Sequence, residues 1–485
     1  MPEGNVVHHL ARRLSRAFAR TAVRVDSPQG RFADEAALEA YKAHPTYEQS
    51  IAAVRPLRDI RIVRPLAFVM PSYKLWETPF YGVGLKMYDA LAGQAGLGST
   101  QFLERMETLR CLPTARADGL KGGVKYWDGQ FDDARLALAV ARTAAREGAL
   151  VLNHCSATEV LHDGGRVSGL VLRDAETGRE LRVQAGCVVN ATGVWVDALR
   201  QQDAAAAGGH AKPMVAPSQG VHVVVDQSFS PGNHALLVPA TADGRVLFAV
   251  PWLGKLILGT TDTPRHDVPL EPKPFEHELD FILQEAGRYL RRAPSRADVL
   301  SAWVGLRPLV KPDSDDSGAT KSISREHTVQ VSRSGLVTVT GGKWTTYRAM
   351  AEDVLAQCVD AGALPERGPS QTAGLRLVGT DTGATTPASS LSEPPGMHLY
   401  GAEQPAVAAL PGAARWLAPG LSEAMVRFAA RHEYARTVED VLARRSRLLF
   451  LHAAAAQGTA PAVAQVLADE LGVHHDVKLE SFQRL

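Results

Sequence analysis

Cysteine is scarce in this sequence, with four among 485 residues: Cys111, Cys155, Cys187 and Cys358. The two nearest in sequence, Cys155 and Cys187, lie 32 positions apart, so there is no CxxC pair. This scarcity excludes a disulfide scaffold and argues against a tetrahedral thiolate zinc site. It suits the reducing cytosol, and we therefore expect a cytoplasmic protein.

An excess of charge of either sign is also lacking. Lys and Arg number 53 and Asp and Glu number 52, which gives a formal net charge of +1. Nucleic-acid-binding domains are usually strongly basic, so no nucleic-acid partner is expected. With 45% hydrophobic and 22% charged residues, the chain has the composition of an ordinary globular protein. Its length suits roughly two to four domains.

Long apolar runs and metal-binding patterns are missing as well. No stretch of about 18 apolar residues occurs, so no transmembrane helix is expected. The sequence has no HExxH pattern and no histidine cluster with the spacing of metal ligands. We therefore expect no metal site.

The N-terminal stretch Asn5–Val25 is rich in arginine and contains no acidic residue. Apolar residues recur at every fourth position from Val6 to Phe18, which is the spacing of one helical face. A mitochondrial presequence and a membrane-surface helix both have this character. The simpler interpretation, which we favour, is a solvated Ala- and Arg-rich helix or a non-native start of the reading frame.

Apolar periodicity and turn residues predict the elements of the rest of the chain. The first half is predicted to contain a helix from the Asp132-Asp133 cap to Glu147, a buried strand Leu150–His154, a hairpin of Val167–Leu172 and Glu180–Val183, and a strand Cys187–Ala191. This order indicates an α/β or α+β nucleotide-binding body.

The second half is predicted to begin with an antiparallel sheet and to end in helices. The expected strands are Val221–Asp226, Arg245–Val250, Lys255–Gly259 and Leu336–Thr340; the expected helices are Phe275–Arg292, Thr345–Val359, Glu423–Leu451 and Pro461–Leu471. Residues 366–396 are dense in Pro, Gly, Ser and Thr, and read as a linker with one strand, Leu375–Val378.

Three features have the residue types that chemistry needs. The strand ending in Thr192-Gly193 would let a flat ligand approach its backbone. The turn Gly341-Gly342-Lys343 leads from a strand into a helix whose N-terminus can hold an anion, although it is not a Walker P-loop. Four cationic residues, His222, Arg307, Arg325 and Lys343, could meet an anionic ligand. Taken singly, each feature also has an ordinary structural explanation.

Several motifs in a fixed order resemble the FAD-dependent glycerol-3-phosphate dehydrogenases. The resemblance extends from about Pro56 to near the C-terminus. It rests on Val63–Leu66, Gly84–Asp89, Lys125–Leu136, Asn190–Gly193, Gly259–Asp262, Gly305–Leu309, Gly341–Arg348 and Arg431–Leu442.

The resemblance implies a fold of α/β plus α+β class. It implies a Rossmann-like FAD-binding domain that is incomplete in this chain, an antiparallel substrate-facing sheet, and a small all-α C-terminal domain. The expected boundaries are 1–54 for an atypical N-terminal segment without family match, 55–365 for the FAD-binding and substrate domain, 366–396 for the linker, and 397–485 for the helical domain.

The resemblance also implies a reaction, in which glycerol 3-phosphate is oxidised to dihydroxyacetone phosphate and a hydride passes to FAD. His222 is the expected base, because its ordinary pKa lies nearest neutrality. Arg307 is expected to orient the hydroxyl group and stabilise its developing charge. Arg325 and Lys343 would hold the phosphate, while Thr261 and Asp262 would line the pocket. The roles of His222 and Arg307 could be exchanged.

The residues that the resemblance implies for FAD binding come from three segments. They are Ala157, Thr192, Gly193, Gly341, Gly342, Lys343, Thr345 and Thr346. The family's GxGxxG turn is not in this sequence: Gly82-Val83-Gly84 has Met87 where the third glycine belongs. That turn makes most pyrophosphate contacts, so its absence would impair FAD binding. We expect a truncated or frame-shifted start, with a segment supplied by another chain and a non-catalytic relative as alternatives. Gln219 also stands where many relatives have Lys.

The implied partners are glycerol 3-phosphate and a quinone-type electron acceptor, with a peripheral contact at the cytoplasmic face of the membrane and a homodimer as further expectations. Two other functions stay open. One is a non-catalytic protein that binds glycerol phosphate or a partner without FAD, and the other is a glycerol-3-phosphate oxidase that uses oxygen.

Overall fold

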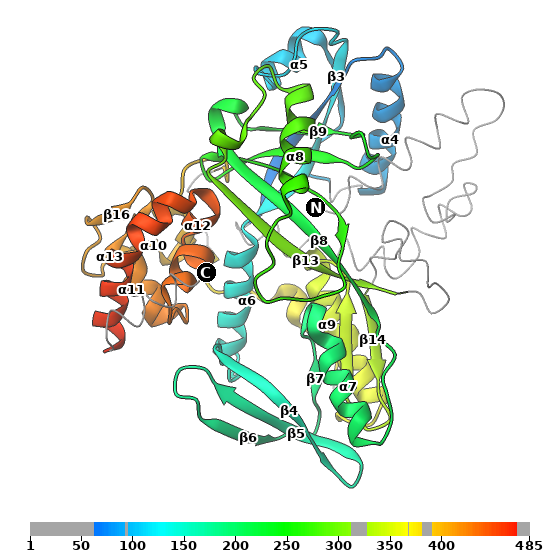
Figure 1. Ribbon diagram of the computed structural model, residues 1–485, viewed down its shortest axis with the longest axis vertical. Coiled ribbons are helices and arrows are strands. Elements are labelled where there is room, and N and C mark those ends of the chain that lie inside the picture. The colour runs from blue at the N-terminus through cyan, green and yellow to red at the C-terminus, as the bar shows by residue number, and fades with distance from the viewer. Residues whose placement is uncertain (1–62, 93–95, 312–326, 367, 381–389, 473–485) are drawn as a thin grey trace, which may run out of the picture.

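The computed structural model describes residues 63–92, 96–311, 327–366, 368–380 and 390–472 (Figure 1). The predicted N-terminal helix, the segment 1–54 and Arg325 lie outside these ranges. Within the described part of the chain, no helix is both long and apolar enough to cross a membrane.

A nine-stranded sheet is the largest element of the described structure. Its strands follow the order β12-β8-β11-β10-β9-β1-β3-β2, and β13 pairs with the free edge of β8. Their bounds are β1 (Val63–Ser72), β2 (Gln101–Glu104), β3 (Gly122–Phe131), β8 (Val215–Asp226), β9 (His234–Val238), β10 (Leu247–Trp252), β11 (Lys255–Gly259), β12 (Thr263–Pro264) and β13 (Ser301–Val310). Neighbouring strands are antiparallel except β1 and β9. The predicted antiparallel sheet is therefore confirmed, and β8 and β13 cross the centre of the molecule (Figure 1).

Strand alternation gives this sheet two different faces. One face packs against α8 (Glu276–Tyr289) and α5 (Arg105–Cys111), and its core includes Val221, Val223 and Leu236. The other face carries Phe68 and Phe248 in a core with the helix α4 (Glu77–Ala92). Because the two cores take alternate residues of the same strands, the register of each strand also decides which side chains are left for a site.

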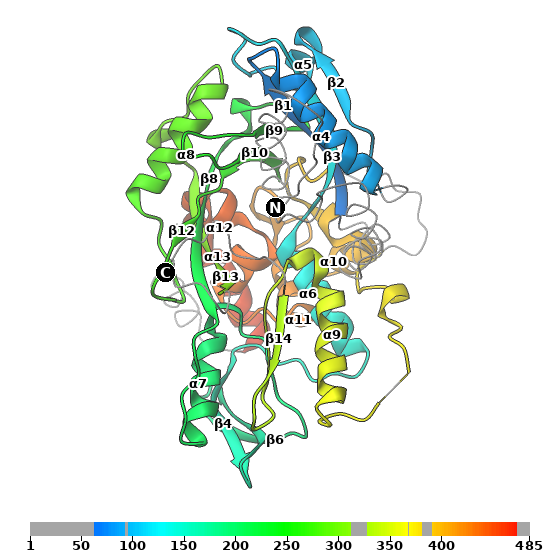
Figure 2. The same ribbon diagram turned by 90° about the vertical axis from the view of Figure 1, so that its right-hand side faces the viewer.

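A second group of elements lies at the end of β8 and β13 that is remote from α4, α5 and α8 (Figure 2). It contains a three-stranded sheet of β14 (His327–Val331), β15 (Val337–Gly341) and β7 (Val189–Asn190), with α7 (Val196–Ala206) and α9 (Tyr347–Asp360) beside it. A separate hairpin sheet consists of β4 (Cys155–Asp163), β5 (Arg166–Asp174) and β6 (Glu180–Gln184).

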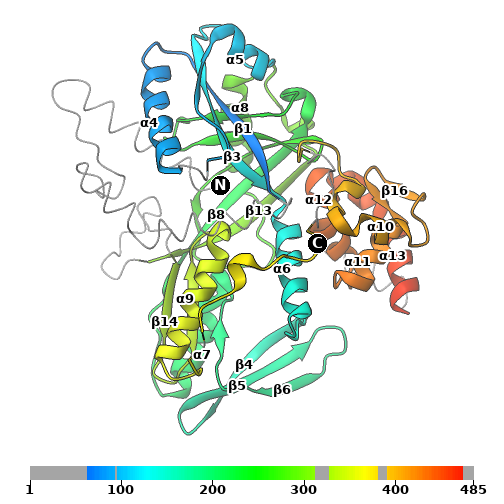
Figure 3. The same cartoon turned by 180° about the vertical axis from the view of Figure 1, so that it is seen from behind.

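The C-terminal domain is helical, as predicted, apart from a short hairpin of β16 (Trp416–Ala418) and β17 (Leu421–Ser422). Its core lies among α10 (Gln404–Ala408), α11 (Glu423–His432), α12 (Leu448–Leu451), α13 (Ala453–Leu471) and the π-helix η9 (Asp440–Arg445). It packs beside α6 (Asp133–Arg146) (Figure 3), where a buried ion pair joins Arg135 to Glu433. The Arg135 guanidinium also lies 4.2 Å from the ring centroid of Tyr400.

Most of the predicted elements are confirmed, but two predicted strands are wrong. The single helix predicted over Glu423–Leu451 is also wrong, because the chain is divided there into α11, η9 and α12. The helix α6 begins after Asp132, whose side chain accepts hydrogen bonds from two backbone N–H groups of its first turn. Residues 150–154 are not a strand: they belong to none of the sheets in the described part of the chain, and Leu150 is 85% exposed. Residues 375–378 are not a strand either. They run along α6, where Thr143 accepts from the backbone N–H of Val378 at 2.9 Å.

His154 ties the body to the C-terminal domain. Its Nε2 lies 2.8 Å from a carboxylate oxygen of Asp440, and the neighbouring Asn153 donates to the backbone oxygen of Tyr434. The hydrogen bond to Asp440 raises the pKa of His154. The pKa of Asp440 is lowered well below its usual range: burial would raise it, and the bonds from His154 and the backbone N–H of Arg436, together with Arg445, overcome that effect.

The signs of these shifts define a pH window. A raised histidine pKa stabilises the fold below the unfolded value and loses this effect as pH rises; a lowered aspartate pKa loses its effect as pH falls. The pair should therefore stabilise most between about pH 4 and pH 6.5.

We expect His154→Asn to lower the free energy of unfolding by about 1 kcal/mol at pH 5.5 and by less at pH 8.5, as measured by urea denaturation. Asparagine suits the positive φ of 51° at this position. The same substitution at exposed His266 is the control, and an equal loss at both pH values for His154→Asn would contradict the assignment.

Candidate active site

The pairing of β8 with β13 brings the main candidate residues onto one face. The two strands are antiparallel, with Trp303 opposite His222, Gly305 opposite Gly220, and Arg307 opposite Ser218. Because side chains alternate along a strand, these six residues face the same side, while Val221 and Val223 face the core against α8. The structure therefore places His222 and Arg307 on the same face of two adjacent strands.

Arg307 is held by the loop that follows β11. Its guanidinium donates to the backbone oxygen of Thr261 at 3.1 Å and to the hydroxyl of Thr260 at 3.0 Å. A carboxylate oxygen of Asp262 lies 3.6 Å from Nη1 and also accepts a hydrogen bond from Ser218. These contacts fix the guanidinium plane and leave 31% of the side chain exposed, so it can also meet a ligand.

His222 is positioned by ring stacking. Its imidazole lies 4.2 Å from the ring centroid of Trp303, and the two planes are 17° apart. Trp303 in turn meets the ring of Phe450, from α12 of the C-terminal domain, edge to face at 5.5 Å. The His222 Nδ1 and Trp303 Nε1 atoms are buried and have no hydrogen-bond partner within the described residues. Two such atoms are costly to bury unless a ligand satisfies them.

Burial, and secondarily the charge of Arg307, lower the pKa of His222 to about 3. The imidazole is therefore neutral at physiological pH and can accept a proton. An anionic ligand bound beside it would offset the charge of Arg307 and make the imidazole a stronger base.

Two glycines make room for these side chains. A Cβ atom at Gly220 would lie 2.3 Å from the Arg307 guanidinium, and one at Gly259 would lie 2.4 Å from the His222 ring. Neither contact is compatible with the present positions of the two side chains. The absence of a side chain at these two positions is therefore part of the site.

Thr261 is not directed toward the same face. Its hydroxyl accepts from the backbone N–H of Val221 and donates to the buried carboxylate of Glu278 in α8. Gln219 donates to the same carboxylate at 2.7 Å and accepts from Arg265 at 2.6 Å. Thr261 thus reaches Arg307 through its backbone oxygen, and the Gln219 side chain lies on the α8 side of the sheet.

The segments expected to bind the cofactor meet beside β13. The short 3-10 helix η2 (Gly193–Trp195) contacts both β13 and β15, and the Thr340 hydroxyl donates to the backbone oxygen of Gly193 at 3.4 Å. Gly193, Gly341 and Gly342 have φ values of 63°, 75° and 73°, which favour glycine. Thr192, Lys343, Thr345 and Thr346 adjoin these glycines in the chain.

These turns suit the flavin end of FAD. A Cβ atom at Gly193 would meet no atom within 4 Å apart from those of its chain neighbours, so there is open space beside this residue. The half-exposed Lys343 and Thr346 precede the N-terminus of α9. The turns offer backbone N–H donors and positive potential to an anionic ring edge. Ala157 is not brought to this cluster by the sheet pairing, because it lies exposed on β4 in a separate sheet.

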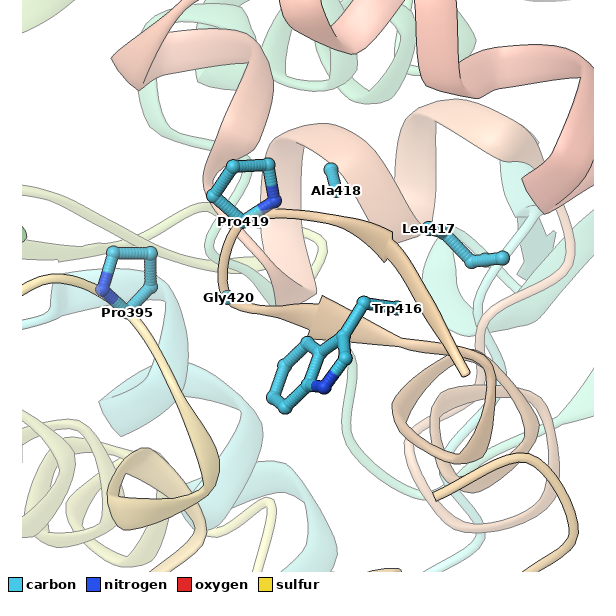
Figure 4. A pocket seen from close by; sticks show the side chains of 6 residues that line it. All are labelled: Pro395, Trp416, Leu417, Ala418, Pro419 and Gly420. Atoms are coloured by element: carbon cyan, nitrogen blue, oxygen red, sulfur yellow. The ribbon is translucent and has the colours of Figure 1, made fainter. Parts of the chain in front are cut away.

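A different hollow, of about 480 Å³, lies in the C-terminal domain and is lined by Pro395 and residues 416–420 of the β16–β17 hairpin (Figure 4). It shares no residue with the candidate active site. The described residues contain no group of three or more His, Cys, Asp or Glu side chains that could hold a metal ion.

The sequence reasoning missed several residues of this site. Trp303, Gly220, Gly259, Ser218 and Thr260 were not assigned roles, although the first lies two positions along the strand from Gly305 and four from Arg307. Period-two alternation from Arg307 would have found Trp303. The glycines could have been found only from the distances across the sheet.

Comparison with known families agrees with this architecture. The sequence model described as FAD dependent oxidoreductase matches residues 39–348, and that described as C-terminal domain of alpha-glycerophosphate oxidase matches residues 370–478. The first match includes residues 39–54, which our sequence reasoning had left without a family match. The predicted boundary at 54/55 stays a prediction.

Curated relatives are similar over most of the chain. A probable mitochondrial glycerol-3-phosphate dehydrogenase from Caenorhabditis elegans is 41% identical over 431 residues, which is 84% of this chain and 59% of the relative. The mitochondrial enzyme of Rattus norvegicus is 41% identical and covered to 58%. That of Arabidopsis thaliana is 37% identical and covered to 69%. The chain thus spans about three fifths of the length of the animal relatives.

A solved structure has the same fold. The glycerol-3-phosphate dehydrogenase from Bacillus halodurans complexed with FAD superposes with a TM-score of 0.71 at 27% identity, covering 91% of this chain and 84% of that one. From the domain matches, the relatives and the shared fold, we conclude that this chain belongs to the FAD-dependent glycerol-3-phosphate dehydrogenase family within the FAD-dependent oxidoreductases.

Proposed function

We propose that this chain oxidises glycerol 3-phosphate to dihydroxyacetone phosphate with FAD as the hydride acceptor. The observation that supports it best is the placement of neutral His222 and fixed Arg307 on one face of β8 and β13. On the same face, buried nitrogens of His222 and Trp303 have no hydrogen-bond partner within the described residues. A base and a cation on adjacent strands suit the removal of a hydroxyl proton together with a hydride.

His222 would take the proton of the substrate hydroxyl. Its imidazole is uncharged at neutral pH, and stacking on Trp303 fixes the ring plane. Arg307 would donate to the substrate oxygen and stabilise negative charge that develops as the proton leaves. Lys343 and Arg325 would hold the phosphate, and Asp262 and the backbone of Thr261 would orient the guanidinium. Bound FAD would supply the redox chemistry by accepting the hydride.

The cofactor would be held by the turns at Thr192, Gly193, Gly341, Gly342, Thr345 and Thr346. The proposal includes Ala157 as a more distant contact. It also includes a quinone-type acceptor for the electrons, a peripheral contact at the cytoplasmic face of the membrane, and a homodimer. The support for these partners is the family alone, and the nematode and rat relatives are named as mitochondrial.

A direct test is the purified full chain. We expect a flavin absorption band and reduction of an artificial dye by glycerol 3-phosphate. Release of hydrogen peroxide at a matching rate without dye would instead indicate the oxidase. A folded, colourless chain that binds glycerol 3-phosphate without turnover would support the non-catalytic alternative. Reconstitution with added FAD separates weak cofactor binding from absence of the site.

The charge of Arg307 should be visible in the titration of His222. In Arg307→Met we expect the pKa of His222 to rise, because the adjacent positive charge is gone, while burial keeps it below about 6.5. Ring nitrogen NMR of protein labelled at histidine can follow this down to the lowest pH at which the fold persists. His234 is an internal control, because burial and Lys125 lower its pKa. An unchanged pKa of His222 in Arg307→Met would show that the imidazole and the guanidinium do not interact electrostatically.

Substitution of the two glycines should damage catalysis more than stability. We expect Gly220→Ala and Gly259→Ala to lower kcat/KM by about 100-fold, because a displacement of about 1 Å in a catalytic group has this effect. The displaced atoms are side-chain atoms, so thermal unfolding should change little. Gly186→Ala, at an exposed position with open space, is the matched control. Wild-type kcat/KM in both variants would refute the positioning role of these glycines.

A further inference from the structure

Cys187 and Cys358 form a close thiol pair. The pair lies at the ends of β7 and α9 that are remote from the turns Thr192-Gly193 and Gly341–Thr346. Their sulfur atoms lie 3.6 Å apart, although 171 positions separate them in the sequence. Cys187 precedes β7 and is partly exposed, whereas Cys358 lies near the end of α9 and is completely buried. The fold, and not local sequence, brings them together.

The surroundings hold the two sulfurs in place. Cys358 belongs to a small buried core with Val337 and Val354, against which Cys187 and Leu364 pack. Burial and the neighbouring Cys187 raise the pKa of the Cys358 thiol to about 11. Of the two, Cys187 is therefore the one that an oxidant in water can reach, and Cys358 is protected until its neighbour has reacted.

We infer that Cys187 and Cys358 are a site of reversible oxidation, which a disulfide reagent of the glutathione class converts to an intramolecular disulfide. The Cys187 thiol loses its proton and its sulfur attacks one sulfur of glutathione disulfide; the reagent's S–S bond breaks and one glutathione thiolate leaves. Cys358 then loses its proton and attacks the Cys187 sulfur, and the second glutathione leaves. Two protein thiols have lost two electrons and two protons, and one glutathione disulfide has become two glutathione thiols.

The bond would join the elements that carry the cofactor turns. β7 leads into Thr192-Gly193, and α9 follows Gly341–Thr346, so a disulfide would tie the far ends of two segments whose other ends meet beside β13. The restraint acts on these turns without placing any cysteine in the site. The presence of the disulfide can be tested without any measurement of catalysis.

The test uses the native full chain, reduced, freed of reductant, and exposed to glutathione disulfide. After alkylation of the remaining thiols and tryptic digestion, we expect peptide 183–200 to be linked to peptide 349–367, and the free thiols to fall from four to two. The linkage should disappear after reduction. Persistence of four alkylated thiols, or linkage of these peptides only after denaturation, would overturn the inference.

Single variants test the order of the two steps. In Cys358→Ser, Cys187 should retain one glutathione, because the attacking thiol is gone; in Cys187→Ser, buried Cys358 should stay a free thiol. Cys155→Ser is the matched control and should still form the linked peptides. Circular dichroism checks that each variant is folded. A glutathione adduct on Cys358 in Cys187→Ser would contradict the inferred order.

Discussion

The antiparallel register of β8 and β13 is the constraint on which the candidate site depends. Hydrogen bonding sets Trp303 opposite His222 and Arg307 opposite Ser218, and strand alternation then sends Val221 and Val223 into the core. A shift of one residue would bury His222 against α8 and expose valines on the site face. The buried valines therefore stabilise the geometry of the site, because the same register satisfies both faces.

The C-terminal domain takes part in this arrangement from outside the sheet. Phe450 packs on Trp303, and the Arg447 guanidinium lies 4.5 Å from the ring centroid of Phe450 and 5.3 Å from that of Trp252. Arg447 is itself buried and donates to Asp133 at the start of α6. The stack runs from Arg447 through Phe450 and Trp303 to His222. The helical domain therefore restrains the Trp303 ring, on which the His222 imidazole stacks. The ion pair between Arg135 and Glu433 joins the helical domain to the first turn of the same helix, α6.

Local sequence signals predicted much of the fold because they act locally. The Asp132 cap, the hairpin of β5 and β6, and the limits of β11 all follow from turn residues and periodicity. The prediction of a strand at residues 150–154 was wrong because a short apolar run becomes a strand only where another strand pairs with it. The strand predicted over Cys187–Ala191 pairs with β15 only at Val189 and Asn190, and Val189 is 42% exposed.

The candidate site could be predicted where the residue types of a motif indicate the chemistry. It could not be predicted where a residue's role depends on its distance from residues on other strands. His222 and Arg307 stand out as basic residues in apolar strands, but the stacking of Trp303 and the direction of the Thr261 hydroxyl depend on distances across the sheet. The contact of Cys187 with Cys358 is of the same kind, since nothing near either residue in the sequence indicates the other.

Gly220 and Gly259 also bear on how variation in this protein should be interpreted. Their neighbours are the ends of side chains, so a methyl group there can be accommodated by moving His222 or Arg307 while the backbone stays in place. Selection for folded, abundant protein would accept such changes, and only selection for turnover would remove them. Surveys that score only protein abundance would then classify substitutions at Gly220 and Gly259 as neutral. At these two positions, however, the lack of a side chain determines where His222 and Arg307 can lie.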